Sequence, residues 1–261
     1  TLGATQAWQW QRDQQGRRVA YVSIDATGVP QQGPKGSQAE GRMPYVAMVY
    51  NPPAEKPKKD GGASSAAEDA TAHPAGPTTT KEPKAKPMQA RYLAGLYTLG
   101  LLGQLLRKQA CQVGMEEAEV WIGLSDAGSG LEDFLRENFN RPEVVLILDF
   151  YHPASRLEEL AKAWHEGDAE KAQAQALGWC RTLKHQGGDK LLEQLRALPP
   201  PKRGTAKQKY QEMVGYVENH KHKMNYPEYL KQGWHIGSGA VESACKTVVG
   251  QRLKLAGMRW G

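Results

Sequence analysis

Two short apolar runs with a helical segment between them constrain the fold of this chain more than any other feature. The runs are EVWIGLSD at 119–126 and PEVVLILDFYH at 142–152, and both are rich in branched residues, which is typical of buried strands. The segment between them, GSGLEDFLRENF at 128–139, has the spacing of an amphipathic helix. This succession predicts a right-handed βαβ unit whose second strand, apolar on both faces, is a central parallel strand. The chain is therefore expected to have an α/β fold.

Three further strands and a long insertion are expected before this unit. Residues 19–25 alternate polar and apolar side chains and predict a strand with one polar face, while 43–51 predict its partner in a hairpin. Residues 90–97 indicate a short third strand, and leucines at helical spacing follow it at 96–110. Residues 52–88 are mostly Pro, Ala, Lys, Thr and Gly, and we expect them to be disordered because they cannot bury enough apolar surface.

The second half of the chain is expected to be mainly helical. A helix is predicted at 153–166, and residues 168–230 show helical patterns broken at LPPPKRG, with no strand signal. A further helix begins near Ser238. The sequence therefore predicts four parts, which are an amino-terminal extension at 1–16, a core at 17–166, an all-helical insertion at 167–232 and a final helix of the core at 233–261.

Four acidic residues stand where expected elements end or begin. Asp25, Asp126 and Asp149 each close a strand, and Glu242 lies in the first turn of the last helix. Each has an ordinary explanation, because Asp serves as a turn former or helix cap, and Glu complements a helix N-terminus or pairs with Lys246. Three acids that end apolar strands are harder to explain in this way, since clustered carboxylates repel one another unless a cation neutralises them. Oxygen ligands favour Mg²⁺ or Mn²⁺, and two such ions can promote phosphodiester displacement.

Basic residues are concentrated in the last third of the chain. Residues 181–261 contain 15 Lys and Arg against 6 Asp and Glu, whereas residues 1–180 contain 19 against 22. This asymmetry indicates a polyanion partner such as nucleic acid, although basic solvated helix faces are also common. The three dispersed cysteines indicate reduced thiols in a cytoplasmic protein. No apolar run approaches the roughly 18 residues of a membrane span, so no membrane partner is expected.

The chain resembles a known family in four segments that occur in order. These are SIDATGVP, GLSDAGSGL, LILDFYHPASRLEEL and HIGSGAVESACKTVVGQRLKLAGMRW, and they are similar to segments of the DDE transposases of bacterial insertion sequences, in particular the ISKra group. The similarity covers about 17–261, and the last segment is the most specific. It implies a ribonuclease H-like fold, a mixed sheet flanked by helices, to which 17–166 and 233–261 would belong. It also implies three acids that bind two Mg²⁺ or Mn²⁺ ions.

The resemblance assigns roles to the acidic residues. Asp25 matches the first metal ligand, Asp126 the second and Glu242 the last. Asp149 and His152 match a later pair that organises the site, and Asp149 remains the alternative second ligand. The implied activity is metal-dependent cleavage and strand transfer of double-stranded DNA, at element ends and target, by an enzyme that is a homo-oligomer on DNA in the bacterial cytoplasm. The alternatives are a ribonuclease H-like nuclease without strand transfer and a non-catalytic DNA-binding remnant.

DNA contacts are expected from residues around the last acid. Trp234 can stack on unpaired bases or pack in the core, and the cations after Glu242 can contact the phosphate backbone or face solvent. These cations are Lys246, Arg252, Lys254 and Arg259.

Overall fold

The computed structural model describes residues 7–29, 41–52, 88–126, 128, 130–140, 144–237 and 239–250, and of Glu242 and Val248 it describes the backbone alone. Within this part six strands form one mixed sheet in the order β4-β3-β2-β5-β6, with β1 paired to β2. β2, β3 and β4 are antiparallel neighbours, whereas β5 and β6 run parallel to β2. The strands are β1 (Gln11–Arg12), β2 (Arg18–Ala26), β3 (Tyr45–Asn51), β4 (Gln89–Gly95), β5 (Val120–Ser125) and β6 (Val144–Leu148). The coarse prediction of an α/β fold with a mixed sheet flanked by helices is confirmed.

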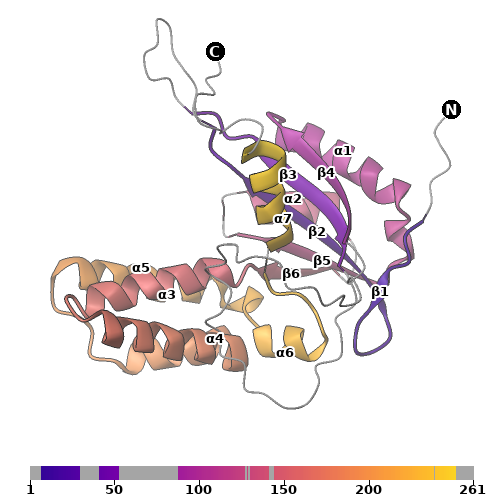
Figure 1. The fold of residues 1–261 in the computed structure, drawn as a ribbon. Coiled ribbons are helices and arrows are strands. Elements are labelled where there is room, and N and C mark those ends of the chain that lie inside the picture. Colours follow the sequence, from indigo (N-terminus) through magenta and orange to yellow (C-terminus); the bar gives the residue numbers. More distant parts are fainter. Residues whose placement is uncertain are drawn as a thin grey trace, which may run out of the picture.

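Helices cover both faces of this sheet (Figure 1). On one face α1 (Leu99–Gln112) and α2 (Leu131–Asn138) pack against Ala20, Val22 and Ile24 of β2. On the other face α7 packs across β2 and β3, and a bundle of helices beside β6 continues the same apolar core. The helices on this side are α3 (Tyr151–Trp164), α4 (Ala169–Ala197), α5 (Gly204–His220), α6 (Tyr226–Lys231) and α7 (Gly239–Ala244). Short helical turns are η2 (Met115–Glu117), η3 (Lys221–Lys223) and the π-helix η4 (Cys245–Gly250).

β2 is the central strand and is buried on both faces, including the polar face predicted for residues 19–25. Tyr21 and Ser23 are 2% and 0% exposed, because α7 and the loop before it cover that face. The Ser23 hydroxyl donates to the Leu124 carbonyl at 2.7 Å, which satisfies its polar group inside the core. Buried polar side chains therefore mark the face on which the site is built.

β6 lies at the edge of the sheet, which corrects its predicted central position. Its side chains are apolar on both faces because both faces are covered: Val144 and Leu146 pack with α1 and α2, and Ile147 packs with the helical bundle. The pairing of β5 with β6 is parallel, as the predicted βαβ unit requires. Apolar side chains on both faces therefore indicate that both faces of a strand are covered, and they do not indicate whether the strand has a neighbour on each side within the sheet.

The region between β6 and α7 contains only helices among its described regular elements, as predicted for 168–230. The break at LPPPKRG coincides with the gap between α4 and α5. α4 is kinked at Gly187, whose φ of 87° lies in the left-handed region that favours glycine. There the Gly188 N–H donates to the Met224 carbonyl at 3.2 Å, so the kink brings the chain close to the segment after η3. The predicted disorder of 52–88 falls on residues outside the described part, except Pro52 and Met88, and it remains a prediction.

None of the described helices combines the length and the apolar character that crossing a bilayer requires.

Candidate active site

Asp25 and Asp126 lie side by side at one edge of the sheet. β2 and β5 are parallel neighbours, and Ile24 is in register with Ser125. The residue that follows each of these is an aspartate, so both aspartates lie at the carboxyl ends of the two strands. The Asp25 side chain is on the face of β2 that α7 covers. Asp25 Oδ1 accepts a hydrogen bond from the Ala26 N–H at 2.7 Å, and Asp126 Oδ1 accepts one from the Gly128 N–H at 2.8 Å. Local hydrogen bonds therefore orient both carboxylates.

Asp149 follows β6 and lies next to the end of β5. Its backbone N–H donates to the Ser125 carbonyl at 2.9 Å, and its side chain is fully buried. Oδ1 accepts from the Tyr151 N–H at 3.1 Å, and Oδ2 lies 3.8 Å from His152 Nε2. Asp149 therefore stabilises the first turn of α3 and lies close to the exposed imidazole of His152.

The loop before α7 is held against β2 and α3. The Phe150 N–H donates to the Ile236 carbonyl at 2.9 Å, and the His235 N–H donates to Tyr21 Oη at 3.1 Å. At Gly237 the chain passes so close to α3 that an added Cβ would lie 2.6 Å from the Tyr151 ring. A larger residue at this position would require the exposed Tyr151 ring to move.

α7 and η4 bring a thiol onto the first aspartate. Cys245 Sγ lies 3.4 Å from Asp25 Oδ2, and the cysteine is 8% exposed. Glu242 precedes Cys245 by three residues, so its backbone lies about one helical turn from the residue that contacts Asp25. The Glu242 side chain lies outside the described part of the structure.

Burial and a neighbouring charge disfavour ionisation of Asp25. Burial is the largest cause and raises the pKa of this carboxyl, and the negative charge of Asp126 raises it further. The hydrogen bonds from Ala26 and Cys245 and the charge of His152 lower the pKa, but the net direction is upward. Two neighbouring carboxylates, of which Asp25 has a raised pKa, form an arrangement that a bound cation stabilises, and oxygen donors suit a hard dication such as Mg²⁺. The residues that are present therefore fit the expected metal.

Two of the three expected ligands are thus together, and the structure leaves the third side chain undescribed. Among the side chains that it does describe, no group of three or more His, Cys, Asp or Glu is close enough to hold a metal ion.

The expected DNA-contacting residues have different surroundings. Trp234 is 8% exposed, stacks on Tyr229 with ring centroids 6.1 Å apart, and has the Arg17 guanidinium 5.6 Å from its ring centroid. Its position fits the core-packing alternative better than stacking on an exposed base. Lys246 is exposed on η4. Arg252, Lys254 and Arg259 lie outside the described residues, and their predicted role stays untested.

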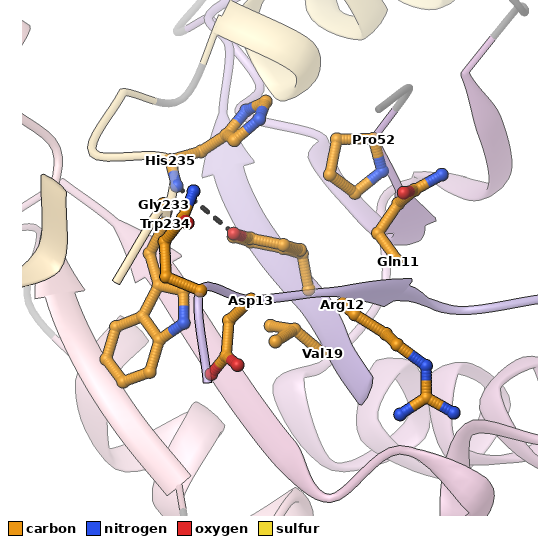
Figure 2. Close-up of a pocket in the computed structure, with 10 residues that line it drawn as sticks. Gln11, Arg12, Asp13, Val19, Pro52, Gly233, Trp234 and His235 are labelled. Atoms are coloured by element: carbon orange, nitrogen blue, oxygen red, sulfur yellow. Dashed lines mark hydrogen bonds between the residues drawn. The ribbon is translucent and has the colours of Figure 1, made fainter. Parts of the chain in front are cut away.

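A cavity of ≈ 170 Å³ lies toward the other end of β2 (Figure 2). Tyr21, which lines it, precedes Asp25 by four residues, about 13 Å along a strand, and none of the predicted ligands lines it. The Asp13 carboxylate at its wall is fully buried and accepts hydrogen bonds from Arg17. This carboxylate therefore stabilises the turn before β2. The lining residues are Gln11, Arg12, Asp13, Gln14, Val19, Tyr21, Pro52, Gly233, Trp234 and His235.

Sequence reasoning missed three residues near the carboxylates. Cys245 stands one turn after Glu242 in ESAC, and this spacing could have indicated its place on the site. Arg156 follows His152 by four residues, the helical spacing that puts both on one face of α3. Tyr216 belongs to α5, which is distant in the sequence, and no sequence pattern relates it to Arg156 or to Cys245.

No model of a known protein family matches the chain, and no curated protein matches it.

Proposed function

We propose that this protein is a DDE-type transposase with a ribonuclease H-like core, which cleaves DNA at the ends of an insertion sequence and joins them to target DNA. The observation that carries the proposal is the convergence of Asp25 and Asp126 at one sheet edge, with α7 holding Cys245 against Asp25. The four sequence segments that resemble transposases contain these same residues. The mixed sheet flanked by helices agrees with the architecture that the resemblance requires.

Asp25, Asp126 and Glu242 would hold two Mg²⁺ or Mn²⁺ ions. When bound, these ions supply an activated hydroxyl nucleophile and stabilise the leaving 3′ oxygen of a phosphodiester. In the first reaction water attacks the phosphodiester at the element end and releases a 3′ hydroxyl. In the second that hydroxyl attacks a target phosphodiester, so one P–O bond forms for each that breaks, and the chain needs no covalent nucleophile.

The protein's own groups position the carboxylates. The Ala26 N–H and the Cys245 thiol bind the two oxygens of Asp25, and the Gly128 N–H binds Asp126. Asp126 is the preferred second ligand because its charge acts on Asp25, whereas Asp149 is committed to the first turn of α3. Asp149 and His152 would organise the site.

Conservative variants test the assignment. We expect Asp25→Asn, Asp126→Asn and Glu242→Gln to reduce Mg²⁺-dependent cleavage of a plasmid that carries an element end by at least about 100-fold, because each removes a metal ligand. Asp133→Asn, which changes an exposed acid of α2 on the opposite sheet face, is the matched control and should cleave normally. Asp149→Asn should lower cleavage less than Asp126→Asn.

The outcome also separates the alternative functions. Joined products identify strand transfer, and cleavage without joining identifies a nuclease. DNA binding without Mg²⁺-dependent products identifies a remnant. Normal cleavage by Asp25→Asn would overturn the proposal.

A further inference from the structure

Two side chains of α3, those of His152 and Arg156, lie on the part of the helical bundle next to the carboxylates. α3 begins two residues after Asp149 and packs against α5. His152 and Arg156 are one helical turn apart on α3, and the charge of His152 reaches Asp25. The face of α3 that carries Arg156 therefore starts at the sheet edge where the aspartates meet.

The Arg156 guanidinium is held in place by an aromatic ring. Its Cζ lies 4.5 Å from the centroid of Tyr216, a residue of α5. Glu159, the acid one turn further along α3, pairs with Lys209 at 2.7 Å, and within the described part of the chain Arg156 forms no ion pair. Arg156 is also exposed. A guanidinium that is oriented by a ring and not neutralised by an acid keeps its charge and its donors available.

The Tyr216 hydroxyl is buried beside the Arg156 guanidinium. Its oxygen forms no hydrogen bond of normal geometry within the part of the chain that the structure describes. Burial, the largest cause, and the charges of Asp126 and Asp149 raise the pKa of Tyr216 to about 12, although the neighbouring Arg156 lowers it, so the hydroxyl keeps its proton. These two charges also show that the hydroxyl is within electrostatic reach of the site. An unsatisfied buried hydroxyl is costly unless a ligand accepts its hydrogen bond.

We propose that Arg156 and Tyr216 together bind one phosphodiester of the DNA strand next to the phosphodiester that is cleaved, an inference that rests on the proposed function. A planar guanidinium and a neutral hydroxyl form a set of donors without an acceptor charge, and a phosphate presents the matching oxygens. The metal ions that Asp25, Asp126 and Glu242 would hold would neutralise the cleaved phosphodiester. Its neighbour along the strand has none, and it requires a cation from the protein.

Salt dependence of DNA binding tests this pair without catalysis. The full chain in EDTA is titrated with a fluorescent duplex of mixed sequence, and log Kobs is plotted against log salt concentration. Arg156→Gln should reduce the magnitude of the slope by about 0.9, because one phosphate contact is lost. Arg107→Ala is the matched control, since it removes an exposed arginine of α1 on the opposite face of the sheet and should leave the slope unchanged.

Two more variants separate charge from geometry. Arg156→Lys should keep the slope but bind more weakly, because lysine retains the charge and loses the planar fork. Tyr216→Phe keeps the ring under Arg156 and removes only the hydroxyl, so we expect binding about 2- to 10-fold weaker with the wild-type slope. Thermal melts of each variant establish that it is folded.

Replacing single phosphates by uncharged methylphosphonates locates the contact. Wild-type binding should be weakened at one position near the cleavage point, and Arg156→Gln should be insensitive to that same replacement. Two results would overturn the proposal that Arg156 and Tyr216 bind a phosphate: a wild-type slope for Arg156→Gln, or equal weakening of wild-type and Arg156→Gln binding by a methylphosphonate at every position. Either result would leave the transposase proposal intact. Normal cleavage by Asp25→Asn would overturn the transposase proposal without changing the salt slopes.

Discussion

Asp25 carries an electrostatic cost that its surroundings only partly offset. Burial and the charge of Asp126 raise the pKa of its carboxyl, against the opposing effects of Ala26, Cys245 and His152. Since the folded-state pKa lies above the ordinary value of 3.8 for an aspartate, the ionised carboxylate is less stable in the folded than in the unfolded protein. Functional sites commonly retain such destabilising groups because the ligand or the reaction needs them.

Asp25→Asn should therefore stabilise the metal-free protein at neutral pH. The stability contributed by protonated Asp25 is fully present below the unfolded-state pKa and is lost as the pH rises through the raised folded-state pKa. The variant should have a higher Tm than the wild type at pH 7, and the difference should vanish near pH 3, as measured by circular dichroism in EDTA. Asp133→Asn, at an exposed position, should show no such difference. A lower Tm for Asp25→Asn at pH 7 would contradict this account.

At the scale of elements, the site depends on helices that are placed by packing. α7 has six residues and is too short to be stable alone, so its position comes from its contacts with β2 and β3 and from the loop held by Phe150 and Tyr21. The bundle beside β6 places α3 and α5, and thereby Arg156 and Tyr216. Its core includes fully buried residues of α4 such as Trp179 and Leu183.

Two leucines of α4 allow the packing of the bundle to be measured. Leu183 is 0% exposed and Leu177 is 44% exposed, so the same change to alanine removes core packing at one position only. We expect Leu183→Ala to lower the free energy of unfolding by about 2–5 kcal/mol, and Leu177→Ala to change it by less than about 0.5 kcal/mol. Urea denaturation measures both. Equal effects of the two substitutions would show that the bundle does not pack as described.

At the scale of the whole molecule, the expected metal would connect separate parts of the chain. Asp25 lies near the end of β2, Asp126 follows β5, and Glu242 lies in α7, more than 100 residues later. These positions can meet only in a folded chain. Metal binding should therefore stabilise the entire fold, because an unfolded chain cannot bring the ligands together.

Mg²⁺ should raise the Tm of the wild type in proportion to its occupancy of the site. At a concentration 100 times the dissociation constant, the free energy of unfolding should increase by about 2.7 kcal/mol. Asp25→Asn should lose most of this effect, and Asp133→Asn should retain it. Differential scanning calorimetry across a Mg²⁺ titration is the appropriate measurement, and an equal Tm increase in all three proteins would argue against binding at Asp25.

The sequence by itself determined most elements, because helices and strands follow periods that nearby residues carry. It predicted the strands at 19–25 and 43–51, the βαβ unit around α2, the helical region before α7, and the aspartates at strand ends. That Asp25 and Asp126 belong to one site was implied by the family resemblance and not by the strand pattern, and the structure places them at neighbouring strand ends.

Only the tertiary structure decided what depends on neighbours distant in sequence. The edge position of β6 was mispredicted, and the burial of the polar face of β2 was not predicted, because an apolar or polar face does not reveal which layer will cover it. The contact of Cys245 with Asp25 and that of Arg156 with Tyr216 each join residues at least 60 positions apart. Such contacts arise from helices packing on the sheet and on one another, and no local pattern encodes them.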